Sequence, residues 1–327
     1  MSQSNSLSES PSEQAEDLGG HETPESREAE PDSGEETREP CPTPLEWHDI
    51  LSRFMNEADH WYLETSLGQI RGRTWGSGPT LYFLNGMSGT HELYALVVWL
   101  LREEYRCVVF DYPRTASATK EALSDLLPQV AQLHGETENL SVITRDFGFQ
   151  IALTCARKHP RLLNTFVCQT PSDGVSLTKA ERVLATLGCR LSAKLKRIPG
   201  RQAIQQRIHR AWFPPYDPSR FNFYLDNTGE QAVCGMAQRF LMQAESLDEW
   251  TDDALPTQTL ILRTEGETPY QTQTAEKIQS IFPAAHTEWL HTSGQLAFLT
   301  HPHRLVKCIK EFLNPESLPD RSSSSPS

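Results

Sequence analysis

Four short apolar runs constrain the fold of this chain more than any other feature. Residues 80–85, 106–112, 140–144 and 258–263 contain the nearly continuous stretches LYFLN, CVVFDY, LSVIT and TLILR. Strands buried on both faces of a parallel sheet have this pattern, because helices cover both faces. We therefore expect a sheet whose central strands are parallel and shielded from water.

Other strand and helix patterns alternate with these runs. Extended segments are expected at 61–66, 69–75, 164–169 and 286–290. Helices are expected at 91–103, 119–133, 149–158, 270–281 and 301–313. Strand–helix–strand alternation favours right-handed crossovers, so the predicted fold class is α/β, with a doubly wound, mostly parallel sheet of about eight strands.

The long stretch between the sixth and seventh strands predicts an inserted cap. Residues 175–250 look helical throughout, and large aliphatic residues recur there at helical spacing: Leu184, Leu187, Leu191, Leu195 and Ile198. An insertion at this point lies over the carboxyl edge of the sheet, where open α/β sheets bind their ligands.

The two ends of the chain differ from the middle in composition. Residues 1–40 hold 12 Asp or Glu against Arg27 and Arg38, which gives −10 of the net charge of −13. They contain no aromatic residue, so they cannot bury enough apolar surface to offset the entropy lost on ordering. We interpret 1–43 as a disordered acidic tail, 44–314 as the folded domain, and 315–327 as a second disordered tail.

Composition also limits the compartment and the ligands. There is no basic and apolar secretory signal, and no window of about 18 apolar residues that would span a membrane. The cysteines form no C-x-x-C pair, which is typical of reduced thiols rather than disulfides or zinc ligands: Cys41, Cys107, Cys155, Cys168, Cys189, Cys234 and Cys308. We expect a cytoplasmic protein without metal or cofactor, and no motif predicts nucleic-acid binding.

The predicted cap carries a local excess of positive charge. Residues 179–210 contain nine Lys or Arg and one acid, Glu181, for a local net charge of +8. Several interpretations stay open: a solvated helix face, contact with an acidic partner, peripheral contact with an anionic membrane surface, or contact with the acidic tail.

The order of these parts resembles the α/β-hydrolase superfamily. NGMSGT at 85–90 looks like the loop that supplies one oxyanion-hole amide, and SVITRDFG at 141–148 looks like the nucleophile elbow. Glu267 stands where the family places its acid, and WLHTSGQLAFL at 289–299 looks like the histidine loop. Within the superfamily the chain is most similar to the maspardin-like group, which implies a cytosolic role through protein partners.

The elbow departs from the family pattern G-x-S-x-G, because Asp146 stands at the nucleophile position and Thr144 replaces the first glycine. One interpretation makes Asp146 a carboxylate nucleophile, as in epoxide hydrolases and haloalkane dehalogenases. The other makes it only the cap of the following helix. Phe147 disfavours dehalogenation, because that branch usually has a tryptophan there to hold the halide.

The base position departs further. Gln295 stands where the family has histidine, and an amide cannot accept a proton near neutral pH. His291 is a displaced alternative, in which case Glu267 would orient it; otherwise Glu267 is a solvated or salt-bridged loop acid. Arg145 is the cation nearest in sequence that could lie between the carboxylates of Asp146 and Glu267.

The backbone amides of Met87 and Phe147 would occupy the two oxyanion-hole positions, and Asn85 could hold that loop by a local bond. The leading hypothesis is a non-catalytic or weakly catalytic binding or adaptor module, with a protein partner or a small ligand in the cleft under the cap. The alternative is a hydrolase of epoxides or alkyl halides, with Asp146 as nucleophile and His291 as base.

Overall fold

The computed structural model describes residues 46–87, 90–115, 117–213, 218–246, 258–292 and 294–314. The predicted tails, 1–43 and 315–327, lie outside them. The strands of the structure are β1 (Asp59–Thr65), β2 (Gly68–Trp75), β3 (Thr80–Leu84), β4 (Arg106–Phe110), β5 (Leu140–Arg145), β6 (Leu163–Gln169), β7 (Gln258–Thr264) and β8 (His286–Leu290).

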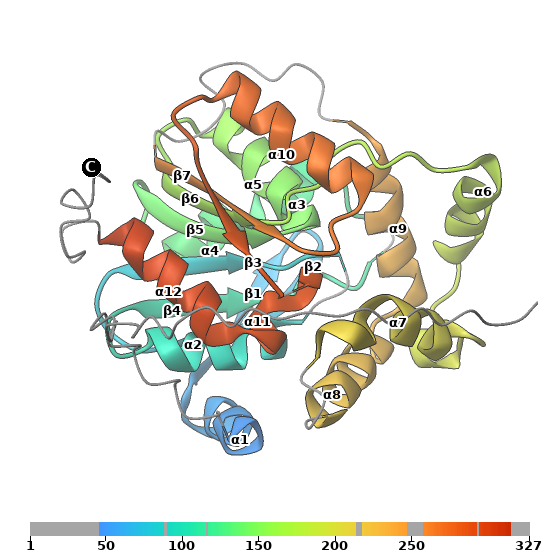
Figure 1. Cartoon of the computed structure of the whole chain (residues 1–327), viewed down its shortest axis with the longest axis horizontal. Coiled ribbons are helices and arrows are strands. Elements are labelled where there is room, and N and C mark those ends of the chain that lie inside the picture. Colours follow the sequence, from blue (N-terminus) through green and yellow to red (C-terminus); the bar gives the residue numbers. More distant parts are fainter. Residues whose placement is uncertain are drawn as a thin grey trace, which may run out of the picture. The chain divides into compact units, whose positions relative to one another are not determined.

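These strands form one sheet in the order β1-β2-β4-β3-β5-β6-β7-β8 (Figure 1). β1 pairs with β2, and β2 with β4, in antiparallel fashion, while every later pair is parallel. The predicted fold class, a doubly wound and mostly parallel sheet of about eight strands, is confirmed. Each predicted strand lies within about two residues of its observed bounds.

The helices that cover the sheet are α1 (Trp47–Glu57), α2 (Ala95–Leu101), α3 (Lys120–Ser124), α4 (Leu126–Leu133), α5 (Phe147–Lys158), α10 (Pro269–Ile281), α11 (Ala297–Thr300) and α12 (Pro302–Leu313), with short 3-10 turns η1 (His91–Tyr94) and η4 (Gly294–Leu296). The sequence did not predict α1, and 119–133 is two helices rather than one. In α1, Trp47, Ile50 and Phe54 are buried at helical spacing.

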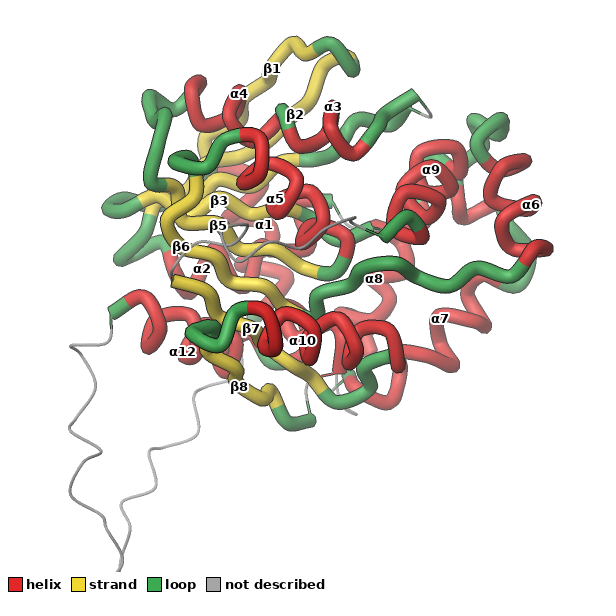
Figure 2. Tube along the Cα trace, turned by 90° about the horizontal axis from the view of Figure 1, so that it is seen from above, coloured by secondary structure: helices red, strands yellow, loops and turns green. Residues whose placement is uncertain are grey.

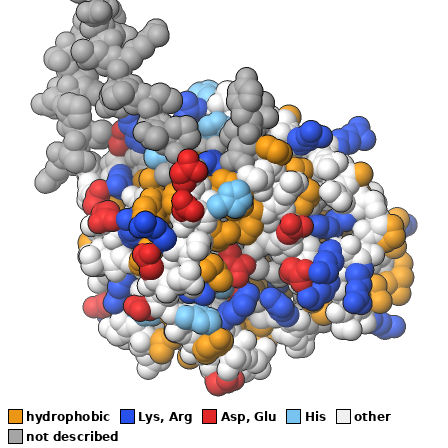
Figure 3. All heavy atoms as spheres, turned by 90° about the horizontal axis from the view of Figure 1, so that it is seen from below, with side chains coloured by type: hydrophobic (Ala, Val, Ile, Leu, Met, Phe, Trp, Pro, Cys, Tyr) orange, Lys and Arg blue, Asp and Glu red, His pale blue; other side chains and the backbone are white. Residues whose placement is uncertain are grey.

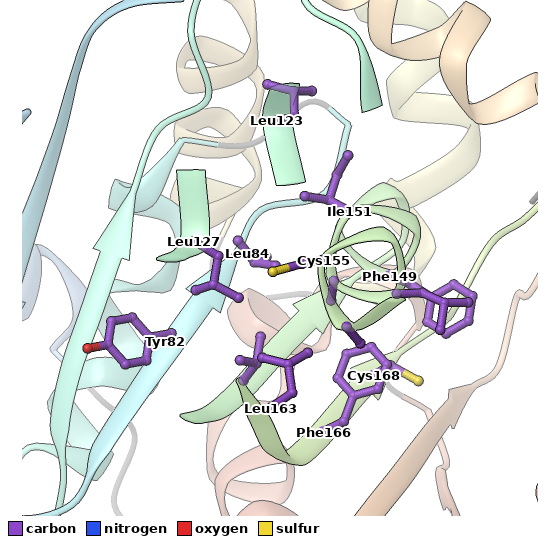
Figure 4. Close-up of a cluster of buried hydrophobic side chains, with 14 of the residues drawn as sticks. Tyr82, Leu84, Leu123, Leu127, Phe149, Ile151, Cys155, Leu163, Phe166 and Cys168 are labelled. Carbon is purple, nitrogen blue, oxygen red and sulfur yellow. The ribbon is translucent and has the colours of Figure 1, made fainter. Parts of the chain in front are cut away.

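Two hydrophobic cores lie on the two faces of the sheet, because its central strands are apolar on both sides. One core joins the strands to α3, α4, α5 and α10. Figure 4 shows part of it, with Ile151 and Cys155 of α5 lying among Leu84 of β3 and Leu127 of α4. The other core joins them to α2, α11 and α12. This packing fixes the strand ends that carry the candidate site.

The insertion between β6 and β7 contains α6 (Lys179–Gly188), η2 (Leu195–Arg197), α7 (Arg201–His209), η3 (Arg210–Trp212), α8 (Pro218–Gly229) and α9 (Val233–Ala244). Figure 2 shows α6 and α7 at one end, beyond the strands. The prediction that 175–250 is helical throughout was wrong. Helix α6 ends at Gly188, because the chain then turns back to bond with the start of α9, where Val233 N–H donates to the Ala193 carbonyl and Cys234 N–H to that of Leu191.

Candidate functional site

Asp146 stands in the sharp turn between β5 and α5. Its backbone has φ 50° and ψ −116°, a strained conformation that non-glycine residues adopt rarely and often at functional sites. Gly148 permits the turn, since a Cβ there would lie 2.6 Å from the Leu84 carbonyl oxygen. Thr144, in place of the first glycine, is buried, and its hydroxyl donates to the Val167 carbonyl at 3.4 Å.

The carboxylate of Asp146 points to the cap and not to its own helix. Its side chain makes no hydrogen bond to the first turn of α5. The interpretation that Asp146 only caps this helix with its carboxylate was therefore wrong. Instead Oδ1 accepts from Ser172 Oγ at 2.7 Å and from Gln243 Nε2 at 2.6 Å. The Gln243 amide also donates to Ser172 Oγ at 2.5 Å, which closes a ring of three hydrogen bonds.

This ring joins three separate parts of the chain. Asp146 comes from the elbow, Ser172 from the segment after β6, and Gln243 from cap helix α9. Ser172 and Gln243 are 0% and 2% exposed, so their polar groups have little access to water. Buried polar groups stabilise a structure when they are paired and cost free energy when they are not. The ring therefore links α9 to the sheet and commits Oδ1 of Asp146 to two hydrogen bonds.

Gln295, at the expected base position, is part of a joint between two loops. Its Nε2 donates to the carbonyl of Gly266 at 2.7 Å, which links the loop after β8 to the loop after β7. Trp212 of the cap packs onto both loops. A Cβ on Gly266 would lie 2.9 Å from its indole, and one on Gly294 would clash with it directly. Both glycines have positive φ, at 80° and 56°. The position at which the resemblance predicts a histidine thus holds an amide, in a joint against which the Trp212 indole packs.

Glu267 is a buried, salt-bridged acid. Its Oε2 accepts from Arg263 at 3.1 Å (Nε) and 2.9 Å (Nη2), and Oε1 accepts from the Thr264 amide at 3.2 Å. Its side chain is only 4% exposed, and the Arg263 guanidinium lies over the Trp289 ring at 4.4 Å. This is the salt-bridged loop acid that the sequence offered as one interpretation. A carboxylate held this way has little capacity left to orient a histidine.

His291, the proposed substitute base, lies on the surface. Its side chain is 69% exposed, its Nδ1 is 3.5 Å from Glu265 Oε1, and its ring stacks on Trp289. Within the described residues, no hydrogen bond or ion pair joins any two of Asp146, Glu267 and His291. The structure therefore does not bring the three candidate catalytic residues together.

Among the described residues Arg145 makes no ion pair with Asp146 or Glu267, the two carboxylates between which the sequence suggested that it could lie. Its guanidinium stacks on Phe298 with 4.7 Å between centres, and the side chain is buried. Burial lowers the pKa of His209 in α7, and the positive charge of nearby Arg145 lowers it further, to about 4. The imidazole of His209 packs edge-on against Tyr224.

The loop that carries the first oxyanion amide is held from two sides. Asn85 Nδ2 donates to the Phe110 carbonyl at 2.6 Å, which is the local bond expected of Asn85. Arg239 of α9 donates from Nε to the Met87 carbonyl at 2.8 Å, and burial lowers the pKa of Arg239 to about 10. Phe147 is the first residue of α5, so its amide has no partner within the helix. The pairing of the Met87 and Phe147 amides as an oxyanion hole stays a prediction, and Ser88 and Gly89 lie outside the described residues.

An apolar groove of about 310 Å³ opens beside this loop. Met87 contributes to its lining, and α6, η2 and α9 supply the rest: Glu181, Leu184, Ala185, Gly188, Leu195, Val233, Met236, Ala237 and Phe240. Ligand sites commonly combine such apolar walls with a few polar groups. Within the described part of the chain, no group of three or more His, Cys, Asp or Glu is placed to hold a metal ion, and no helix is long and apolar enough to cross a bilayer.

Four residues of this site were not predicted from the sequence. Ser172 follows a parallel strand next to β5, so its place at the carboxyl edge was a usable signal. Trp212, Arg239 and Gln243 belong to the cap, whose helices reach the site only through tertiary packing. Their sequence gives no signal of that approach.

Comparison with solved structures finds a similar fold in several esterases. The structure is similar to a thermophilic esterase from Thermogutta terrifontis, with TM-score 0.65 and 17% identity over 79% of this chain and 99% of that one. It is also similar to an esterase from Exiguobacterium antarcticum, with TM-score 0.65 and 15% identity over 77% and 98%. Naproxen esterase from Bacillus subtilis gives TM-score 0.58 and 16% identity over 82% and 95%. No family model and no curated protein matches the sequence. These likenesses show the α/β-hydrolase fold.

Proposed function

We propose, from this α/β-hydrolase fold, that the chain is a binding module whose groove holds an apolar ligand without turning it over. One observation carries the proposal: the Gln295 amide, at the position where the resemblance predicts the base, donates its hydrogen bond to the Gly266 carbonyl. Hydrolysis through either a Ser or an Asp nucleophile needs a base that activates water, and such assistance is worth roughly 10²–10⁴-fold in rate.

The surroundings of Gln295 make a displaced base hard to accommodate. Glu267 is committed to Arg263, and Trp212 packs over the two glycines of the joint. His291 faces solvent beside Glu265. The carboxylate of Asp146 accepts hydrogen bonds from Ser172 and from Gln243 of cap helix α9. These contacts together favour a structural role for residues that hydrolases use in catalysis.

The groove supports an apolar ligand. Its lining side chains are aliphatic, aromatic or thioether apart from that of Glu181, and they include Met87 of the loop after β3. An apolar group that enters it leaves water, which is favourable by about 25 cal/mol per Å² of buried surface.

Binding is tested with cis-parinaric acid, a fluorescent fatty acid, in the absence of membranes. We expect saturable fluorescence enhancement with the native chain. Met236→Glu places a charge in the groove wall and should weaken binding roughly tenfold or more. Met55→Glu is the matched control, because Met55 is a 37% exposed methionine on α1. No saturable binding, or equal loss in both variants, would refute the proposal.

An Asp-nucleophile hydrolase is the second candidate. The strained backbone of Asp146 favours it, because that conformation is costly and residues at functional turns adopt it. An epoxide would be opened by attack of the carboxylate, with the new alkoxide taking a proton from water, and the resulting ester would need a base for its release. Product release that Asp146→Asn abolishes would establish this candidate.

The adaptor role and the cytoplasmic setting belong to the same proposal. The likeness to the maspardin-like group suggests that the module acts through a protein partner. Cys107, Cys155 and Cys168 are buried free thiols, and burial raises the pKa of each, which suits a reducing compartment. Affinity capture from a cytosolic fraction, with the Met236→Glu variant as comparison, tests whether a partner depends on the groove.

A further inference from the structure

The outer surface of the cap exposes an unusual number of aliphatic side chains. Eleven large hydrophobic side chains are exposed in the described part of the chain, and seven of them lie between 183 and 208. They are exposed by 41–67%: Val183, Leu184, Leu187, Leu191, Ile198, Ile204 and Ile208. Scattered exposed aliphatics are normal, but a concentration on one part of a surface indicates a place of contact.

Helix α6 has its apolar residues on the side opposite to the usual one. Its small residues Ala185 and Gly188 are buried, and Gly188 lies against Ala237 and Val233 of α9. At about 100° per residue, Val183, Leu184 and Leu187 fall within one arc on the outer side. An amphipathic helix normally turns such residues toward the core. Small inward residues allow close docking on α9, while the large aliphatics are left in water.

Helix α7 repeats the arrangement. Ile204 and Ile208 are one turn apart, so they share a face, and both are more than half exposed. Gln205 lies on the inner side, where it accepts from Arg201. Both views of the chain place α6 and α7 at the same end (Figures 1 and 2).

Exposed cations accompany these aliphatics. Three of the nine basic residues in 179–210 have partners: Lys194 and Lys196 bind Glu230, and Arg201 donates to the Leu225 carbonyl. The other six are exposed and have no carboxylate within ion-pair distance among the described residues: Lys179, Arg182, Arg190, Arg197, Arg207 and Arg210. Figure 3 shows Lys and Arg side chains gathered with hydrophobic ones at the right-hand end, where Figure 1 labels α6 and α7.

We propose that the outer face of the cap, defined as α6, α7 and the segment 189–200 between them, docks on an anionic lipid bilayer. Surface helices bind membranes through aliphatic side chains that enter the acyl boundary and through Lys and Arg that stay at the headgroups. Each cation near an anionic membrane adds attraction. The cap face has both components side by side, and a bilayer accommodates both.

Two other occupants fit less well. The acidic tail matches the charge, but residues 1–40 contain only Met1, Leu7 and Leu18 as large apolar residues, too few to cover seven aliphatics. A second copy of the chain matches the aliphatics, but face-to-face contact would bring two sets of six cations together. An anionic, apolar-cored surface satisfies charge and hydrophobicity together, which neither the tail nor a second copy does.

Docking would also place the groove at the bilayer. Leu184 belongs both to the exposed face and to the groove lining. An apolar chain could then pass from the membrane toward Met87; this link rests on the proposed function, whereas docking itself does not. The parinaric acid measurement without membranes tests the groove, and vesicle binding tests the face, so the two can fail independently.

The test is flotation of the full-length chain with vesicles of phosphatidylcholine, with and without phosphatidylserine, at low salt. We expect binding to the anionic vesicles only. Arg182→Glu with Arg207→Glu should weaken it roughly tenfold or more. Leu187→Ser with Ile204→Ser should weaken it by a similar factor, because two aliphatic anchors are lost. None of these four residues lines the groove.

The matched control is Leu133→Ser with Arg161→Glu. Leu133 is 46% exposed at the end of α4, and exposed Arg161 precedes β6, so both lie at the amino edge of the sheet, away from the cap. This variant should bind as the native chain does. No anionic binding, or equal loss in the control, would overturn the proposal. So would an aliphatic variant that keeps vesicle binding, or one that only shifts the oligomeric state on gel filtration.

Discussion

The side-chain amide of Gln295 donates a 2.7 Å hydrogen bond to the backbone carbonyl of Gly266. The bond joins the loop after β8 to the loop after β7, the two loops from which the superfamily takes its base and its acid. In this chain the same loops are tied together by a group that cannot move a proton.

Gln295→Glu should lower the free energy of unfolding by about 1 kcal/mol near neutral pH, since the carboxylate cannot donate to Gly266 O. Urea denaturation measures the loss. Acidification that protonates the new carboxyl should restore part of it, because a carboxylic acid can donate. A variant as stable as the native chain at neutral pH would show that the bond does not hold the joint.

Gly294→Ala should destabilise the chain by more than its backbone conformation alone requires. A positive φ costs an alanine about 1–2 kcal/mol, and the new methyl would also clash with Trp212. Gly135→Ala is the control, because Gly135 has φ 80° with no atom within 4 Å of an added Cβ. In a Trp212→Ala background the two glycine substitutions should lower the free energy of unfolding by about the same amount. Equal losses in the native background would show that Trp212 does not pack against Gly294.

Gln243→Leu should destabilise the chain by about 1–3 kcal/mol, because it removes two hydrogen bonds from the ring around Asp146. A double-mutant cycle with Asp146→Ala measures the coupling. We expect an interaction energy of about 0.5–3 kcal/mol, as for other residues in one network. Additive losses would mean that the cap is held to the elbow by other contacts.

The pKa of His209 predicts a loss of stability on acidification. Burial and Arg145 lower that pKa to about 4, against about 6.5 in the unfolded chain, so between these values only the unfolded state binds the proton. The contribution of His209 is complete above about pH 6.5 and falls as pH drops toward 4, by up to about 3 kcal/mol. His209→Phe and His209→Gln should both flatten this part of a stability–pH profile. An unchanged profile in both variants would contradict the assignment.

The sheet was predictable because its signal is local. Strands β3, β4, β5 and β7 are buried on both faces, so their apolar runs marked them in the sequence. The cap was predictable in position but not in detail. Leu191 and Ile198 continue the helical spacing of α6, yet they lie beyond its end because backbone pairing with α9 ends the helix.

The site was predictable only where it follows the strands. The positions of Asp146, Glu267 and Gln295 come from strand order, and in the structure they follow β5, β7 and β8 by one, three and five residues. Their partners could not be foreseen. Gln243 and Trp212 reach the site from the cap, through contacts between segments far apart in sequence. Tertiary contacts of this kind leave no periodic pattern.

Steady-state product formation tests the central claim most directly. The native chain and Asp146→Asn are incubated with a reactive epoxide and with a p-nitrophenyl ester, and released diol and nitrophenol are followed over many equivalents of protein. The Gln295–Gly266 joint predicts that neither product rises above the uncatalysed background and that the two chains behave alike. Product released steadily by the native chain and lost in Asp146→Asn would contradict the claim that this cleft binds without turnover.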